Sequence, residues 1–291
     1  MPELPFLTVL AENLERQVRD RVIEDVVVRG ASVLKTVDPP IGAVRGARIT
    51  GVRRRGKYLL LELDPGLVLT MHLMRNGRLR LVPRTAGGQR PARRAGRDLA
   101  LVLALDDARD LCLIEMGPKK RAAVWLCRSG EEQAGPPAGL GMEPLSDAFT
   151  PDALAGMVRE AHMRLKLFLT TQRFVVGIGN AYADEILWAA RLSPQVIADK
   201  LEAEAIARLH AAITATLSRA IAAHRDELDG ALPMKEPLSL LAVHRHGKEP
   251  CPRCGTPIAV IYYEDRETYY CPTCQTAGRV YADRRRSRLL K

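Results

Sequence analysis

Three features of the 291-residue sequence predict an α+β fold. Short apolar runs separated by turn residues occupy most of the first 127 residues, and such runs are typical of antiparallel strands. After residue 150, apolar residues recur at intervals of three and four, which is the period of a helix with one buried face. Two Cys-x-x-Cys pairs lie near the C-terminus. The order predicts a mostly antiparallel β domain, then a helical domain, then a zinc ribbon.

The N-terminal part is expected to begin with a helix that ends near Asp20, because apolar residues there follow one helical face. These residues are Leu4, Leu7, Leu10, Leu14 and Val18. Strands are expected next at several apolar runs, namely Val26–Val28, Tyr58–Leu63, Leu67–Leu73, Leu99–Leu105 and Ala122–Cys127. The alternation of such runs with turn residues indicates sheets in which successive strands pair.

A Gly- and Pro-rich stretch over residues 128–144 follows neither hydrophobic period and is interpreted as a linker. Thr150 then precedes Pro151, an N-cap residue before the favoured first helical residue. Helical periods continue over residues 165–173, 181–191 and 201–223. We therefore expect domains at 1–128, 150–236 and 237–291, with a linker over 129–149.

Basic residues outnumber acidic ones by 44 − 34 = +10, which favours a polyanionic partner. They are concentrated at Arg53–Lys57, Arg84–Arg97 and Arg284–Arg288. The longest strongly apolar run, Leu99–Leu105, is too short to span a membrane, and Glu3 stands where a secretory signal carries Lys or Arg. We expect a cytoplasmic protein that binds no membrane.

Four of the six cysteines form the two pairs, and their spacing is that of two knuckles around one tetrahedral zinc ion. The predicted ligands are Cys251, Cys254, Cys271 and Cys274. Four thiolates leave no open position for water, so the zinc is expected to be structural. Cys112 and Cys127 lie singly in apolar segments and are expected to be core residues. Between the knuckles, residues 262–268 predict a hairpin whose tip presents Arg266 to a phosphate.

Several segments in order resemble the formamidopyrimidine-DNA glycosylase and endonuclease VIII family. They are Met1–Pro5, Arg55–Tyr58, His72-Leu73, Gly177–Leu187, and Leu241–Pro250 leading into the ribbon with Gln275. The resemblance covers nearly the whole chain. It implies an N-terminal β-sandwich with flanking helices, a helix-two-turn-helix domain and a zinc ribbon, with DNA in the cleft between the halves. It also implies a monomer that acts on damaged double-stranded DNA at the bacterial nucleoid, removes oxidised or ring-opened bases and cleaves abasic sites.

The resemblance assigns catalysis to Pro2, Glu3 and Lys57. After removal of Met1, the secondary amine of Pro2 can attack the sugar C1′, expel the base and form an iminium. An α-amino group titrates near 8, so a useful fraction is unprotonated at neutral pH. Glu3 resembles the acid that protonates the opening sugar ring, and it could otherwise serve only the helix dipole. Lys57 resembles a lysine that reaches a phosphate beside the lesion, although an ordinary strand-edge lysine would fit its context as well.

The same resemblance assigns DNA contacts to Asn180, Arg266, His72 and Arg75. Asn180 stands where a Gly-rich turn enters a helix, so its amide and the nearby N–H groups can bind phosphate, although an Asn there can also simply cap the helix. Asn180 and Arg266 match two phosphate clamps, and His72 matches a position facing the DNA. Arg75 stands where the family has the methionine that fills the gap left by the flipped base.

The sequence departs from the family pattern at several points. Phe6 replaces a frequent glutamate, and residues 115–121 lack the aromatic wedge of the neighbouring loop. Either Arg75 or Met74 can fill the stack, and no recognisable lesion-binding segment lies between Asp226 and Leu240. A non-catalytic binder of damaged DNA on the same scaffold is the alternative, and a zinc-ribbon transcription or translation factor explains the cysteines but not the N-terminus. The preferred lesion does not follow from these residues.

Overall fold

The computed structural model describes the chain except for residues 31, 85–97, 132–137, 238–239, 264–265 and 282–291, and it describes only the backbone of Tyr263 and Arg266. Most of the expected basic cluster Arg84–Arg97 and all of Arg284–Arg288 therefore lie outside the described residues. The chain forms two compact units. The first comprises residues 1–139 and 223–237, and the second comprises residues 140–222 and 238–291.

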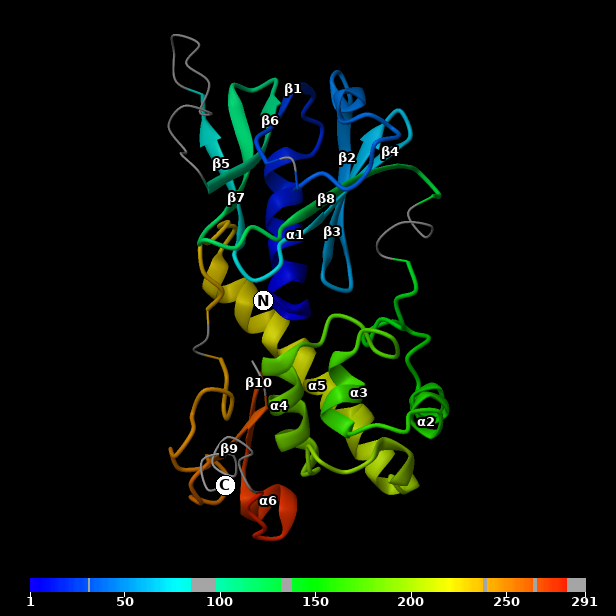
Figure 1. Cartoon of the computed structure of the whole chain (residues 1–291), viewed down its shortest axis with the longest axis vertical. Coiled ribbons are helices and arrows are strands. Elements are labelled where there is room, and N and C mark those ends of the chain that lie inside the picture. The colour runs from blue at the N-terminus through cyan, green and yellow to red at the C-terminus, as the bar shows by residue number, and fades with distance from the viewer. Residues whose placement is uncertain (31, 85–97, 132–137, 238–239, 264–265, 282–291) are drawn as a thin grey trace, which may run out of the picture. The chain divides into compact units, whose positions relative to one another are not determined.

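The first unit holds two four-stranded sheets (Figure 1). One sheet has the order β1-β6-β7-β5, and the other has the order β2-β3-β4-β8. Every strand pairing within them is antiparallel, which confirms the predicted domain type. The strands are β1 Ile23–Val28, β2 Arg48–Arg55, β3 Tyr58–Asp64, β4 Leu67–His72, β5 Gly77–Pro83, β6 Leu99–Leu105, β7 Arg109–Glu115 and β8 Ala123–Arg128, with a short 3-10 helix η1 at Ile41–Val44.

Helix α1, Leu4–Val18, packs against β2 and β3 with the predicted apolar face inward. Its five predicted face residues, Leu4, Leu7, Leu10, Leu14 and Val18, are all buried. Strand β3 carries three successive leucines, Leu59–Leu61, that are buried although their side chains alternate between the two sheet faces. Both faces of β3 are therefore covered. Cys112 and Cys127 are buried free cysteines, as expected.

The last turns of helix α5, Ala203–Leu228, and the segment up to Pro237 belong to the first unit. Arg225 at the end of α5 forms an ion pair with Glu12 of α1, at 2.7 Å. The sequence predicts one helical domain over residues 150–236, because helical period alone does not show which layer a helix end packs against. Contacts such as the ion pair with Glu12 of α1 place residues 223–237 in the first unit.

The second unit is helical with a small hairpin. It contains α2 Pro151–Arg159, α3 Leu165–Thr170, α4 Asn180–Ala190, the 3-10 helix η4 Ala198–Lys200, α5 up to Ala222, β9 Ala259–Tyr263, β10 Arg266–Tyr270 and α6 Pro272–Thr276. The Thr150 hydroxyl accepts a hydrogen bond from the Ala153 N–H at 3.1 Å, which confirms the predicted N-cap. Strands β9 and β10 form the predicted antiparallel hairpin. Within the described residues, every helix is too short or too polar to cross a lipid bilayer.

Candidate functional site

The second and third residues of the chain lie inside the first unit, whereas Met1 is exposed. Pro2 and Glu3 are buried, and α1 begins immediately after them at Leu4. Glu3 occupies the N-cap position, but its side chain makes no capping hydrogen bond to the helix. The carboxyl group of Glu3 therefore does not cap α1 through a hydrogen bond, although its position at the start of the helix suits the helix dipole.

Charged side chains from separate segments surround the N-terminal amine, which in this chain belongs to Met1. Burial lowers the pKa of this amine, while the carboxylates of Glu236 and Glu3 act to raise it. The cations of Arg75 and Lys57 lower the pKa further. Three predicted site residues, Glu3, Lys57 and Arg75, thus come together around the terminus. A lowered pKa increases the fraction of free amine at neutral pH.

Lys57 is placed by the two-residue hairpin between β2 and β3, in which Arg55 pairs with Tyr58. Gly56, at φ +56°, takes the left-handed conformation that this tight turn requires. The lysine is only 5% exposed, so it is not the ordinary strand-edge lysine that its sequence context allows. Its ammonium group influences both the N-terminal amine and His72.

His72 ends β4 and is a neutral imidazole at physiological pH. Burial lowers the pKa of His72 to about 4, and the nearby Lys57 ammonium acts in the same direction. Its Nδ1 accepts a hydrogen bond from the Met74 N–H at 3.1 Å, which places the remaining ring proton on Nε2. Tyr58 packs edge-on against the ring, with 4.8 Å between centroids. The imidazole therefore offers one N–H donor and carries no charge.

The loop between β4 and β5 carries Arg75 in an exposed position, beside a partly buried Met74. Met74 has φ +52°, and the Gly77 N–H closes the turn on the Leu73 carbonyl at 2.8 Å. A Cβ at Gly77 would lie 2.4 Å from that carbonyl oxygen, so only glycine fits. The loop thus presents Arg75 outward and Met74 partly inward.

Glu236 is the site residue that sequence reasoning missed. It lies beyond α5, in a stretch without hydrophobic period, so no sequence pattern marks it. Burial raises the pKa of Glu236 to about 8, and the adjacent Glu3 carboxylate acts in the same direction. The N-terminal amine, the Glu3 N–H and Arg78 act to lower it. Glu236 is therefore a carboxyl group that is largely protonated at neutral pH.

In the second unit, Asn180 is the first residue of α4, and Gly179 is the N-cap. Asn180 does not cap this helix. Its side-chain Nδ2 instead donates to the Glu267 carbonyl oxygen at 2.7 Å. Because Arg266 is the first residue of β10 and directly precedes Glu267, the two predicted phosphate-binding positions are adjacent. The side chain of Arg266 lies outside the described residues.

The acidic pair of α4 holds the segment that leads into the ribbon. Asp184 is fully enclosed and binds Lys166 and His244, each at 2.7 Å. Glu185 accepts three backbone N–H groups, from Ala242, Val243 and His244, at 2.8–2.9 Å. These two carboxylates satisfy buried donors that would otherwise lack partners. Both acids in the Gly177–Leu187 motif thus have a structural role.

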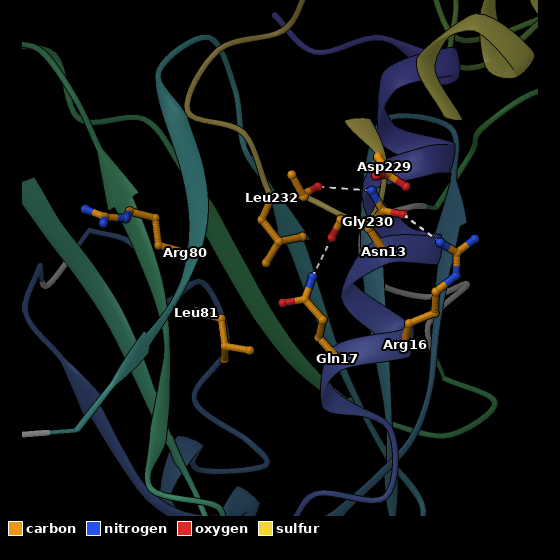
Figure 2. A pocket seen from close by; sticks show the side chains of 9 residues that line it. Asn13, Arg16, Gln17, Arg80, Leu81, Asp229, Gly230 and Leu232 are labelled. Carbon is orange, nitrogen blue, oxygen red and sulfur yellow. Dashed lines mark hydrogen bonds between the residues drawn. The ribbon is translucent and has the colours of Figure 1, made fainter. Parts of the chain in front are cut away.

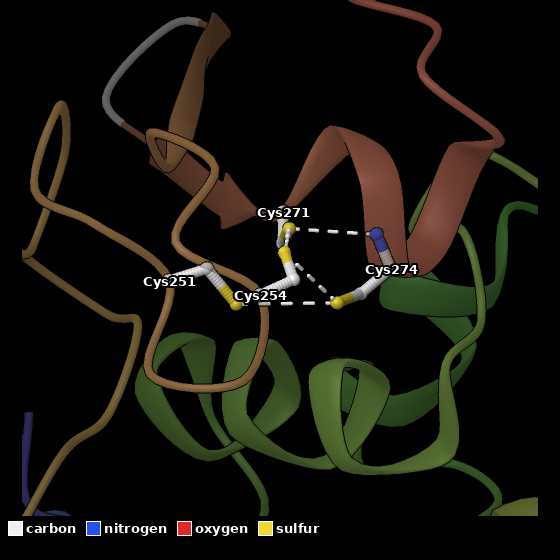
Figure 3. A group of neighbouring side chains, drawn as sticks. All are labelled: Cys251, Cys254, Cys271 and Cys274. Atoms are coloured by element: carbon white, nitrogen blue, oxygen red, sulfur yellow. Dashed lines mark hydrogen bonds between the residues drawn. The ribbon is translucent and has the colours of Figure 1, made fainter.

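The four ribbon cysteines form a site that fits one zinc ion (Figure 3). Their sulfur atoms all lie within 4.8 Å of one another, close to the separation of about 3.8 Å that Zn–S bonds of about 2.3 Å give in a tetrahedron. The Trp188 indole N–H donates to Cys251 Sγ at 3.3 Å. Gln275 accepts the Cys271 N–H and donates to the Leu192 carbonyl, which ties the second knuckle to the segment that follows α4. The set of four sulfurs is a structural site with no position for substrate.

The two sheets, the helical unit with its zinc ribbon and the amine enclosed by carboxylates and lysine define a DNA glycosylase of base-excision repair with lyase activity. Three family descriptions match the chain in order: "Formamidopyrimidine-DNA glycosylase N-terminal domain" over residues 1–117, "Formamidopyrimidine-DNA glycosylase H2TH domain" over 140–229, and "Zinc finger found in FPG and IleRS" over 248–277. The chain belongs to the formamidopyrimidine-DNA glycosylase family.

Individual relatives agree over almost the full length. The formamidopyrimidine-DNA glycosylase of Chloroflexus aggregans is 37% identical over 281 residues, with 94% of this chain and 98% of that protein covered. Among solved structures, the MutM (Fpg) protein of Thermus thermophilus is 32% identical, with a TM-score of 0.79 over 94% of this chain and 98% of that one. Lactococcus lactis Fpg in complex with DNA containing an abasic site is 26% identical, with a TM-score of 0.80 over 94% and 99%.

Proposed function

We propose that this protein removes oxidised or ring-opened bases from damaged double-stranded DNA and cleaves the strand through an iminium formed on Pro2. The observation that carries the proposal is the enclosure of the N-terminus by Glu3 and Lys57, with Arg75 facing the same amine. Solved structures of relatives are complexes with DNA that contains Fapy-dG or an abasic site, which supports this substrate class.

The chemistry begins when removal of Met1 makes Pro2 the N-terminal residue. The nitrogen of Pro2 bonds to the sugar C1′, the damaged base leaves with the bonding electrons, and the proton that the nitrogen loses neutralises the departing base. The C1′–O4′ bond then opens, and Glu3 supplies the proton that O4′ takes up. The resulting iminium acidifies the neighbouring sugar proton, so β-elimination can break the strand.

Lys57 is proposed to bind a phosphate beside the lesion while its charge keeps the adjacent amine unprotonated. The Nε2–H group of His72 is proposed to donate a hydrogen bond to the DNA, while the imidazole ring stays uncharged. Arg75, exposed at the tip of its loop, is proposed to contact the gap that the extruded nucleotide leaves. Stacking by a planar guanidinium suits that position.

Asn180 and Arg266 are proposed to hold two phosphates of the damaged strand. Adjacent clamps on a rigid helix and a zinc-stabilised hairpin can keep the backbone bent, which offsets the free energy of unstacking a nucleotide. The division into a catalytic domain 1–128, a linker 129–149, a DNA-binding domain 150–236 and a zinc ribbon 237–291 belongs to the same proposal. So does the expectation of a cytoplasmic monomer that associates with the nucleoid through DNA.

The test is to mix the Met1-processed protein with duplex DNA that contains one abasic site, add borohydride and look for a covalent protein–DNA band. We expect a band that maps to Pro2, a loss of the band in Pro2→Gly and a strong reduction in Glu3→Gln. Trapping does not depend on the identity of the lesion. Tight DNA binding without any band, from protein with a verified Pro2 terminus, would instead support the non-catalytic damage binder.

A further inference from the structure

The segment that carries Glu236 is held in place by side chains of the catalytic unit. Figure 2 shows Asn13 and Gln17 of α1 pointing toward the turn that follows α5. The Asn13 amide donates to the Ala231 carbonyl at 3.0 Å, and the Gln17 amide donates to the Gly230 carbonyl at 2.7 Å. Arg78 of β5 binds the Met234 carbonyl at 2.5 Å. Three anchors within five residues give this segment a defined path, so the position of Glu236 is set by the fold.

The Glu236 carboxyl group lies against the first residues of the chain. It accepts a hydrogen bond from the backbone N–H of Glu3, and its charge acts on the amine of Met1. Pro2 stands between these two partners. Removal of Met1 therefore creates the reactive secondary amine at the residue between the two groups with which Glu236 interacts.

The charged groups that face Glu236 determine its protonation. Glu3, at the start of α1, repels its negative charge, while the N-terminal amine and Arg78 of β5 attract it. The positive charges of Arg75 and Lys57 also act on this amine and lower its pKa. Burial is the largest influence and raises the pKa of Glu236 to about 8. At neutral pH, this carboxyl therefore has a proton to donate.

We propose that Glu236 donates a proton to the group that leaves C1′ when the nitrogen of Pro2 attacks. The inference rests on the proposed iminium mechanism and adds a second acid to it. In the open aldehyde form of an abasic site, the oxygen that leaves is bonded to the carbon that the amine attacks and remains there until water departs, so a carboxyl beside the amine is within reach of that oxygen. Glu3 serves the ring oxygen O4′, and Glu236 serves the other substituent of C1′.

The step balances with an abasic site in its open aldehyde form. The Pro2 nitrogen bonds to C1′, and the aldehyde oxygen takes the Glu236 proton. That oxygen then leaves as water with the proton of the Pro2 N–H, and the C=N bond forms. The products are the iminium cation, water and the Glu236 carboxylate, so charge is conserved. The new carboxylate lies beside the new cation and stabilises it.

Position 6 of α1 supplies no carboxyl group to the N-terminus, because it is occupied by Phe6. Its ring is 2% exposed and packs edge-on against His224, at 5.9 Å between centroids, so position 6 contributes to the core. The glutamate that relatives often carry at this position, as the family pattern implies, has no counterpart on α1. The loop after α5 supplies a carboxyl group to the N-terminus instead.

The experiment measures the single-turnover rate of trapping with cyanoborohydride on abasic-site duplex DNA between pH 5.5 and 9.5, using Met1-processed protein. Wild type is compared with Glu236→Gln, Glu236→Asp and the matched control Glu227→Gln, an exposed glutamate on α5. Glutamine keeps an oxygen that can accept the Glu3 N–H. Thermal unfolding and affinity for DNA with an uncleavable abasic analogue are measured for every variant.

We expect the wild-type rate to fall as pH rises through about 8, because Glu236 then loses its proton. Glu236→Gln is expected to be roughly 100-fold slower below pH 7, the typical size of a general-acid effect, and to lack the alkaline fall. Glu236→Asp should keep the alkaline fall at a reduced rate, and Glu227→Gln should match wild type. DNA affinity and unfolding midpoint should stay within the range of the control.

A wild-type rate and pH profile in Glu236→Gln would overturn the role of Glu236 while leaving the Pro2 mechanism intact. A faster rate in this variant at pH 6 would also overturn it, because a purely electrostatic carboxylate would only hold the amine protonated. A slow rate that follows loss of folding or DNA affinity would assign Glu236 a structural role and equally reject the proposal. If wild type itself gives no trapped product, the proposed function fails and this inference fails with it.

Discussion

The side-chain amide of Asn180 donates a hydrogen bond to the backbone carbonyl of Glu267, with 2.7 Å between Nδ2 and the oxygen. This bond joins the first residue of α4 to the second residue of β10, and Arg266 is the first residue of that strand. Lys166 donates to the same carbonyl at 2.8 Å. The start of β10, and with it the backbone of Arg266, is therefore positioned by side chains of the helical unit.

This relationship predicts that Asn180 and Arg266 act together in DNA binding. Arg266→Ala should weaken binding to all sequences alike and reduce the salt slope by about 1, as loss of one phosphate contact does. Asn180→Ala should weaken binding as well, and the double variant should lose less than the sum of the two. Residues that share one interaction are non-additive by about 0.5–3 kcal/mol.

Titration of a fluorescent duplex at several salt concentrations measures these effects. Lys200→Ala is the matched control, because Lys200 is an exposed cation of the same unit. Strict additivity of Asn180→Ala and Arg266→Ala would show that the two positions bind DNA independently.

The enclosed ion pair of Lys166 and Asp184 predicts a large stability effect. Asp184→Asn leaves the Lys166 ammonium buried without its counter-charge, and removal of one partner of a buried pair costs about 3–5 kcal/mol. Glu204→Gln, which breaks the exposed pair with Arg208, should change the free energy of unfolding by less than about 1 kcal/mol. Chemical denaturation followed by tryptophan fluorescence tests both. Equal effects of the two substitutions would contradict a structural role for Asp184.

His72 predicts a loss of stability in acid. Its folded-state pKa of about 4 lies below the ordinary value of 6.5, so the unfolded chain binds the proton more readily. The stabilisation is therefore present above pH 6.5 and disappears as pH falls toward 4, with an upper limit of about 3 kcal/mol. His224, also buried, contributes in the same direction.

The variant His72→Asn isolates this contribution, because its side-chain oxygen can still accept the Met74 N–H. We expect its unfolding free energy to decrease less steeply than that of wild type between pH 6.5 and 4, while the contribution of His224 remains in both. Parallel pH curves for the two proteins would show that His72 is not a buried neutral imidazole.

The zinc ribbon predicts that loss of the metal weakens DNA binding without preventing iminium formation on Pro2. Cys271→Ser removes a buried ligand and should lower the zinc content from one ion to a small fraction, unfold the ribbon and weaken DNA binding. Trapping through Pro2 should persist at saturating DNA, because the four zinc-binding cysteines all lie in the second unit. Cys112→Ala, at a buried free cysteine, is the control and should retain its zinc. Metal analysis, affinity and trapping rate distinguish the cases, and unchanged DNA affinity in Cys271→Ser would refute the gripping role.

The features that depend on local spacing could be predicted from the residues alone. The period of α1, the Thr150 N-cap and the two Cys-x-x-Cys knuckles all follow from residues a few positions apart, whose geometry is set by the helix or by the metal. These features need no knowledge of how distant segments meet. Pro2 and Glu3 were assigned differently, through the resemblance of the segment Met1–Pro5 to a known family, and their catalytic roles stay predictions.

The groups that share an environment although they are distant in the chain became known from the folded structure. Glu236 lies more than two hundred residues from Glu3 in the chain, yet its carboxyl accepts the Glu3 N–H, and burial there makes it an acid at neutral pH. Asn180 resembled a helix cap in sequence, but the cap is Gly179 and the amide holds β10. Protonation and hydrogen-bond partners depend on desolvation and on contacts across the fold, and neither quantity is encoded in local sequence spacing.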